Sequence, residues 1–84
     1  MTDQEFDLMD ELYFVKTFTE LTDVKHIKHQ TIIETLKQLL EQHWVKILDE
    51  NDNEIGYNAT SFAKNINNYH FIATKAGLLA HNGR

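Results

Sequence analysis

The sequence QTIIETLKQLLEQHWVKILD, from Gln30 to Asp49, carries the clearest structural signal in the chain. Its apolar residues follow the helical period and fall on one side of a helical wheel. They are Ile32, Ile33, Leu36, Leu39, Leu40 and Trp44. After Trp44 the period shortens to two, and Val45 and Ile47 are residue types that favour strands. We therefore predict an amphipathic helix that leads into a strand with almost no linker.

The boundaries of these two elements can also be predicted. Thr31 and Glu34 have the spacing of a capping box, so the helix is expected to begin near Thr31. Polar residues 50–53 follow the strand and predict a turn. A returning strand is expected at 69–73, where aromatic and branched residues gather. The polar stretch between them, residues 61–68, is expected to be a long loop.

Three further helices are expected outside this central stretch. Thr2 and Glu5 form another possible capping box, which predicts a first helix that ends near residues 18–20. Residues 22–23 can cap a short second helix. Thr74 is suited to cap a last, short helix near the C-terminus. The order of helices and strands predicts an α+β fold.

Composition and charge narrow the class of protein. The chain of 84 residues is expected to form a single domain over 1–84. It contains no cysteine, which rules out disulfides and thiolate catalysis and fits a reducing compartment. No apolar run is long enough to span a bilayer, and the acidic N-terminus does not resemble a signal peptide. We therefore expect a cytoplasmic protein that does not enter a membrane.

The distribution of charge bears on possible partners. The net charge is −5, and no acidic residue follows Ile55, where the charged side chains are Lys64, Lys75 and Arg84. Overall negative charge disfavours non-specific binding to nucleic acid, because contacts to phosphates supply most of that affinity.

Two segments resemble winged-helix proteins. LKQLLEQHWVKILD is similar to a third helix running into the first strand of a wing, and YHFIATKAGLLAH to the returning strand and its following helix. The pieces ELYFVKTF and ATKAGLLAHN are also similar to a family of short bacterial proteins without an established activity. The winged-helix resemblance implies three N-terminal helices, a two- or three-stranded antiparallel wing and a short C-terminal helix. The chain departs from that pattern in the short region between the first and third helices and in the long loop before Tyr69.

The resemblance implies a possible nucleic-acid interface. In winged helices that bind DNA, the third helix enters the major groove, and glutamine side chains there can pair with adenine. The residues that would contact DNA are Lys25, Lys28, His29, Gln30, Thr31, Lys37, Gln38 and Lys64. Glu34 and Glu41 share the outward face of this helix and would repel phosphates. A solvated helix face is the alternative interpretation.

Apolar residues outside the main helix point to a second role. We expect Phe14, Phe18, Phe62 and Ile66 to supply exposed apolar surface for a protein partner or for a homodimer. A central helix in a small core is the simpler explanation for the apolar run around Phe14. The leading hypothesis is a non-catalytic, protein-binding or self-associating module. The alternative is a DNA-binding transcriptional regulator that uses the Thr31 helix and the wing.

No motif predicts an enzyme, a cofactor, a metal site or a small-molecule ligand. Asp49-x-Asn51-x-Asn53 is similar to the start of an EF-hand loop, but Glu54 and Thr60 replace its required glycine and glutamate. His26 and His29 lack a third ligand and are expected at the surface. His43 is expected on the core side of its helix. Ser61 has no neighbouring base, so nucleophilic catalysis is not supported.

Overall fold

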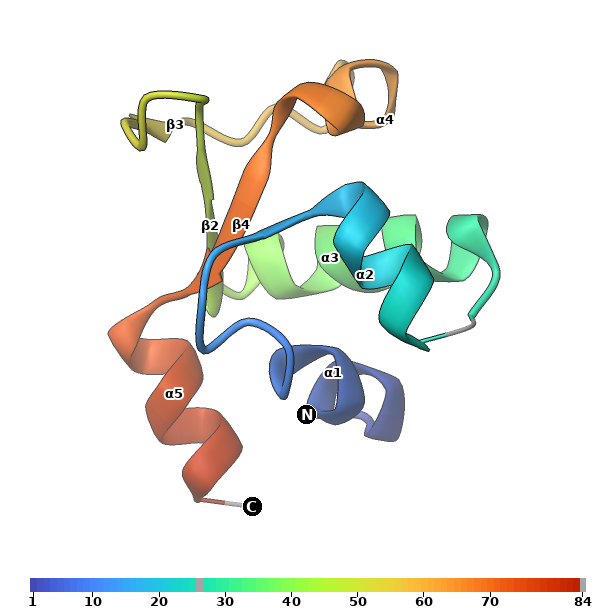
Figure 1. Ribbon diagram of the computed structural model, residues 1–84. Coiled ribbons are helices and arrows are strands. Elements are labelled where there is room, and N and C mark those ends of the chain that lie inside the picture. Colours follow the sequence, from blue (N-terminus) through green and yellow to red (C-terminus); the bar gives the residue numbers. More distant parts are fainter. Residues whose placement is uncertain (26, 84) are drawn as a thin grey trace.

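The computed structural model describes residues 1–25 and 27–83, the side chain of Lys25 excepted. In these residues five α-helices, one 3-10 helix and four strands alternate along the chain (Figure 1). They are α1 (Asp3–Met9), β1 (Lys16–Thr17), α2 (Phe18–Lys25), α3 (His29–Glu41), β2 (Val45–Leu48), β3 (Glu54–Ile55), α4 (Phe62–Asn65), η1 (Ile66–Asn68), β4 (His70–Ala73) and α5 (Lys75–Asn82). The predicted α+β class is confirmed.

The strands form one antiparallel sheet in the order β1-β4-β2-β3. The predicted return of the chain alongside β2 is confirmed, with Val45 opposite Ala73 and Ile47 opposite Phe71. Figure 1 shows α3 leading into the lower end of β2 and α5 descending from the lower end of β4, while β3 and α4 lie at the upper end of this pair. The helices α1, α2 and α3 gather beside the sheet and enclose the core with it.

The predicted helix and strand of the central stretch are confirmed as α3 and β2, but their junction differs from expectation. The helix begins at His29, with Lys28 as its N-cap, so the capping box predicted at Thr31 is wrong. At the other end His43 adopts a left-handed conformation with φ 60°. The N–H groups of His43 and Trp44 donate to the carbonyls of Leu40 and Leu39, at 3.1 and 3.0 Å. This pairing is a Schellman motif, and it turns the His43 side chain outward rather than into the core.

The first helix is shorter than predicted. The Thr2–Glu5 capping box is confirmed, but α1 ends at Met9 rather than near residues 18–20. A capping box at Thr17 and Glu20 begins α2: Glu20 N–H donates to Thr17 Oγ1 at 3.2 Å, and Thr17 N–H to Glu20 Oε1 at 2.9 Å. The predicted cap at residues 22–23 is therefore wrong. Thr17 also belongs to β1, a strand that the sequence did not predict.

The expected loop at residues 61–68 contains α4 and η1. Phe62 and Ile66 lie one helical turn apart and both point into the core. The Phe62 ring meets the rings of Tyr57, Tyr69 and Phe71 at centroid distances of 5.5, 5.9 and 5.9 Å. Burial of aromatic surface therefore folds a segment whose polar composition predicted a loop.

The last helix docks through its first turn. Thr74 caps α5 as predicted, because Thr74 Oγ1 accepts from Gly77 N–H at 3.0 Å. The same hydroxyl donates to the His43 carbonyl at 2.6 Å, and Thr74 N–H donates to the Trp44 carbonyl at 2.9 Å. Gly77 lies directly over the Trp44 carbonyl. The turn after α3 and the start of α5 thus form one joint.

In the part of the chain that is described, every helix is too short or too polar to cross a membrane.

Candidate functional site

The nucleic-acid candidates are spread over several elements. Lys28, His29, Gln30 and Gln38 are exposed at the start and along the outer side of α3, while Thr31 and Lys37 are half-buried. Lys64 is exposed on α4. The side chain of Lys25 lies outside the described residues. The His29 ring packs edge-on against Phe18 at 5.6 Å, which ties it to the core.

The outer stripe of α3 is more acidic than basic. Glu34 and Glu41 are exposed on it together with Gln30 and Gln38. Gln30 Nε2 donates to Glu34 Oε1 at 3.2 Å, so this amide is engaged within the helix. A groove-facing surface of this composition presents two carboxylates to the phosphates of a duplex, which lowers its affinity for DNA.

The protein-interface candidates divide sharply. Phe18, Phe62 and Ile66 are 7 %, 1 % and 4 % exposed, so the expectation that they form an exposed surface is wrong. Phe18 begins α2 and packs inward, and Phe62 and Ile66 also belong to the hydrophobic core. Phe14 is 77 % exposed, as the interface hypothesis requires.

Phe14 lies at the centre of a short apolar turn between α1 and β1. We name residues Tyr13, Phe14 and Val15 the Phe14 turn; both neighbours of Phe14 are also exposed. The turn is held on both sides: the Leu12 carbonyl accepts from Ala73 N–H at 2.8 Å, and Lys16 pairs with Phe71 across the β1–β4 ladder. An exposed aromatic ring is therefore presented on a backbone that the sheet fixes.

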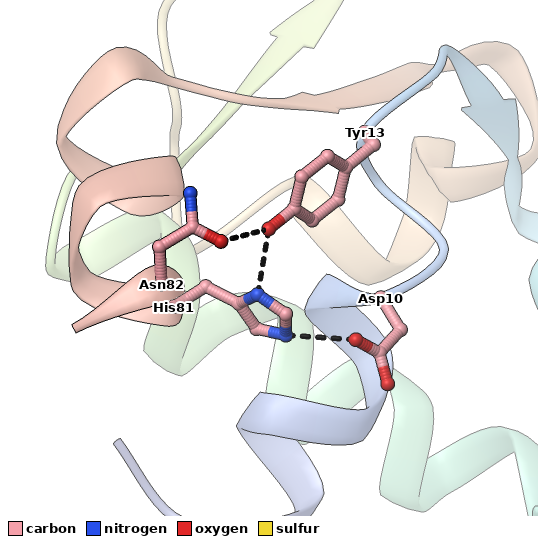
Figure 2. A network of polar contacts seen from close by, with 4 residues as sticks. All are labelled: Asp10, Tyr13, His81 and Asn82. Atoms are coloured by element: carbon pink, nitrogen blue, oxygen red, sulfur yellow. Dashed lines mark hydrogen bonds and ion pairs between the residues drawn. The ribbon is translucent and has the colours of Figure 1, made fainter. Parts of the chain in front are cut away.

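Four polar side chains next to this turn form a network that joins it to α1 and α5 (Figure 2). The Tyr13 hydroxyl lies 2.8 Å from His81 Nδ1 and 2.8 Å from Asn82 Oδ1. His81 Nε2 lies 2.8 Å from Asp10 Oδ1. Figure 2 shows the imidazole between the carboxylate on one side and the phenol on the other. The network spans nearly the whole length of the chain in sequence.

His81 is the buried member of this network. Its side chain is 9 % exposed, and the Phe6 ring stacks on it at 4.1 Å with an interplanar angle of 19°. Asp10 is about half exposed, at 46 %. Among the described residues His81 Nε2 has no well-aligned hydrogen bond, although Asp10 Oδ1 lies 2.8 Å from it. Asp10, Tyr13 and Phe6 thus surround the imidazole on three sides.

Two grooves flank the sheet. The first is lined by side chains of β2 and of the segment after β3, including Val45, Ile47 and Tyr57. Burial, and secondarily the nearby Glu41 carboxylate, raise the pKa of Tyr57 above its ordinary value. Its hydroxyl is buried without a hydrogen-bond partner among the described residues. The second groove lies between the turn after β2 and η1, and includes His70.

A metal centre has no basis in the described geometry. Within residues 1–25 and 27–83, no group of three or more histidine, aspartate or glutamate side chains could hold an ion together. The EF-hand-like stretch is instead a closed turn, because Asp49 Oδ1 accepts from the N–H groups of Asn51 and Asn53 at 2.8 and 2.9 Å. The Asp49 carboxylate thus holds the backbone of this turn rather than facing a cation.

In comparisons with known proteins, no family model, no curated protein and no solved structure matched the chain.

The network around His81 was not predicted from the sequence. Tyr13 and His81 are separated by 68 residues, and no local pattern pairs them. A partial signal exists at His81, which lies seven residues, or about two helical turns, after Thr74 in an expected helix whose leucines are predicted to pack inward. A polar residue buried at the end of such a helix needs a partner.

Proposed function

We propose that this chain is a non-catalytic protein-binding module of the winged-helix type. The observation that supports the binding role is the Phe14 turn. A large aromatic side chain is 77 % exposed there, although the backbone on both sides is anchored to the sheet. Aromatic anchors held in place before binding lose little conformational entropy on association, and such residues dominate interface energetics.

The charges around the turn define the kind of partner. Asp7 is exposed on α1 and Asp10 directly after it, on the way into the turn, and Glu20 is exposed on α2, which follows the turn closely. Lys16 is the one basic residue in the first 23 positions, and it is half-buried. We therefore propose a protein partner that inserts an apolar side chain beside Phe14 and surrounds it with lysine or arginine. A second copy of this acidic chain would bring like charges together.

The winged-helix assignment is part of the proposal. It is supported by the order α1-β1-α2-α3-β2-β4-α5 and by the short β1 strand, which adds to the β2–β4 pair as a third member. It is also supported by α3, which passes into β2 through a single tight turn. The segment from β3 to η1 would then be an elaborated wing.

A peptide-display selection tests the binding role. A library of random peptides is selected against the immobilised chain, and the enriched peptides are measured against Phe14→Ser and Leu79→Ser variants. Leu79 is an exposed apolar residue on α5 and is the matched control. We expect enriched peptides that combine an aromatic or branched residue with neighbouring lysine or arginine, and that lose affinity at least tenfold for Phe14→Ser only.

Three outcomes would overturn this proposal. They are an absence of enrichment, enrichment that does not depend on Phe14, and enrichment of acidic peptides. Light scattering coupled to size exclusion tests whether a second copy of the chain covers the Phe14 turn instead. A dimer that Phe14→Ser converts to a monomer would show that a second copy covers the turn.

DNA binding is the second candidate, favoured by the exposed amide of Gln38 in the middle of α3 and by Lys28 at its start. A gel shift at low salt with mixed duplexes tests it. We expect no shift at tens of micromolar protein, because Glu34 and Glu41 share that surface. A shift that Gln38→Ala abolishes and Phe14→Ser leaves intact would establish DNA binding over the protein-binding role.

A further inference from the structure

The network of Asp10, His81, Tyr13 and Asn82 constrains where its protons lie. A carboxylate accepts hydrogen bonds but cannot donate them. Since Asp10 Oδ1 lies 2.8 Å from His81 Nε2, a bare nitrogen lone pair there would face a second acceptor. The nearby acceptor oxygen therefore favours the tautomer of the neutral His81 ring that carries its proton on Nε2, although this N–H bond is not well aligned with Asp10. This leaves Nδ1 of the neutral ring as an acceptor.

The neutral ring then dictates the rest of the chain of contacts. His81 Nδ1 lies 2.8 Å from the Tyr13 hydroxyl, so Tyr13 must donate its single proton to it. The Tyr13 oxygen is left with acceptor capacity alone. Because Asn82 also lies 2.8 Å from that oxygen, the amide must present its NH2 group rather than Oδ1. The direction of donation runs from Asn82 to Tyr13 to His81.

A charged ring reverses this order. Both ring nitrogens of protonated His81 are donors, so Nδ1–H donates to the Tyr13 oxygen. Tyr13 then directs its own proton to Asn82, whose Oδ1 must face it. This second arrangement is the amide orientation in Figure 2, where Tyr13 donates to Asn82 Oδ1. The two hydrogen bonds of the Tyr13 hydroxyl are made in both arrangements, but the Asn82 amide differs by a half-turn.

We propose that this network is a proton-dependent switch, in which protonation of His81 reverses the hydrogen bonds through Tyr13 and rotates the Asn82 amide. Among the described contacts of His81, the titratable partners are Asp10 from α1 and Tyr13 from the Phe14 turn, while Phe6 and Asn82 are neutral. The switch couples the protonation state of the buried His81 ring to the orientation of the exposed Asn82 amide, while the added proton stays on the ring. It does not depend on a partner at Phe14, so it stands or falls separately from the proposed function.

Nuclear magnetic resonance of nitrogen-15 in the folded chain tests the switch. The ring nitrogens of His81 and the side-chain amide of Asn82 are followed between about pH 5 and 8.5, the range in which histidines titrate. We expect the neutral ring to carry its proton on Nε2, and the Asn82 amide to shift with the same midpoint as the ring. The amide of Asn58, which caps a turn elsewhere through its Oδ1, is the internal control and should not follow His81.

Two variants separate the switch from a merely structural contact. Tyr13→Phe removes the central hydroxyl, so the Asn82 amide should no longer follow the ring. Asn82→Asp replaces the amide with an acceptor only, so Tyr13 must always donate to it, and His81 should keep both ring protons to higher pH than in the unmodified chain. The proposal is overturned if the neutral ring carries its proton on Nδ1. It is also overturned if the Asn82 amide of the unmodified chain does not respond to pH.

Discussion

Gly77→Ala perturbs the joint between the turn after α3 and the start of α5. In the middle of an exposed helix this substitution would stabilise the chain by roughly 0.5–1 kcal/mol, because alanine loses less backbone entropy on folding. Here a Cβ atom would lie 2.0 Å from the Trp44 carbonyl oxygen and 3.0 Å from Met9 Cε. The methionine end can move, but the carbonyl oxygen belongs to the backbone of the α3–β2 turn. It also accepts from Thr74 N–H, so displacing it disrupts the capping of α5.

The expected result is a net loss of stability. Overpacking of this kind costs about 1–3 kcal/mol. For a domain of this size, each kcal/mol corresponds to a change in Tm of about 4–8 °C. Urea denaturation followed by circular dichroism gives the free energy of unfolding. Gly56→Ala is the matched control, since nothing lies within 4 Å of its Cβ position, and it should stay within about 0.5 kcal/mol of the unmodified chain. A Gly77→Ala chain as stable as Gly56→Ala would refute the close packing of α5 on Trp44.

Three further substitutions or titrations test other parts of the structure. Thr74→Ala should lower the free energy of unfolding by about 1 kcal/mol, because the α5 cap is lost, whereas Thr74→Ser should retain most of the stability that the cap provides. Equal losses of stability for the two variants in urea melts would count against the cap. Phe62→Ala should lower the free energy of unfolding by about 3–5 kcal/mol, because it removes the central ring of the aromatic cluster. Phe14→Ala should change the free energy of unfolding by less than about 0.5 kcal/mol. The backbone N–H groups of Asn53 and then Asn51 lower the pKa of Asp49. The stabilisation from this carboxylate is therefore complete above the unfolded-state pKa of about 3.9 and is lost as the pH falls through the lower folded-state pKa. Carbon-13 titration of the Asp49 carboxyl in the folded chain checks this, and a midpoint at or above the unfolded value would be the contrary result.

Strong local periodicity made part of the fold predictable. Leu36, Leu39 and Leu40 define one side of α3, and the change of period at Trp44 marks the start of β2. The pairing of β2 with a returning strand was predictable because branched and aromatic residues gather in one later segment. These features depend on neighbours in sequence, which is why they could be read without the structure.

Features that depend on distant residues were missed or misplaced. β1 is two residues long and exists because it pairs with β4, so no local pattern marks it. The Thr17–Glu20 capping box was readable but was obscured by the apolar run before it, which suggested a continuous helix. Phe62 and Ile66 looked exposed because their neighbours are polar, although the sheet buries them. All four interface candidates were expected at the surface, and Phe14 is the one among them that the structure exposes.

Phe14 lies outside the core on a turn fixed by the sheet, and we propose that it is the ring that a partner meets. Fluorine-19 labelling of the five phenylalanines tests it directly, with a soluble paramagnetic agent and with a basic peptide from the selection. We expect the Phe14 signal to be broadened most by the agent and to shift most on addition of the peptide. The signals of Phe18, Phe62 and Phe71 should stay protected from the agent. A protected Phe14 signal, or a peptide-induced shift centred on another ring, would contradict it.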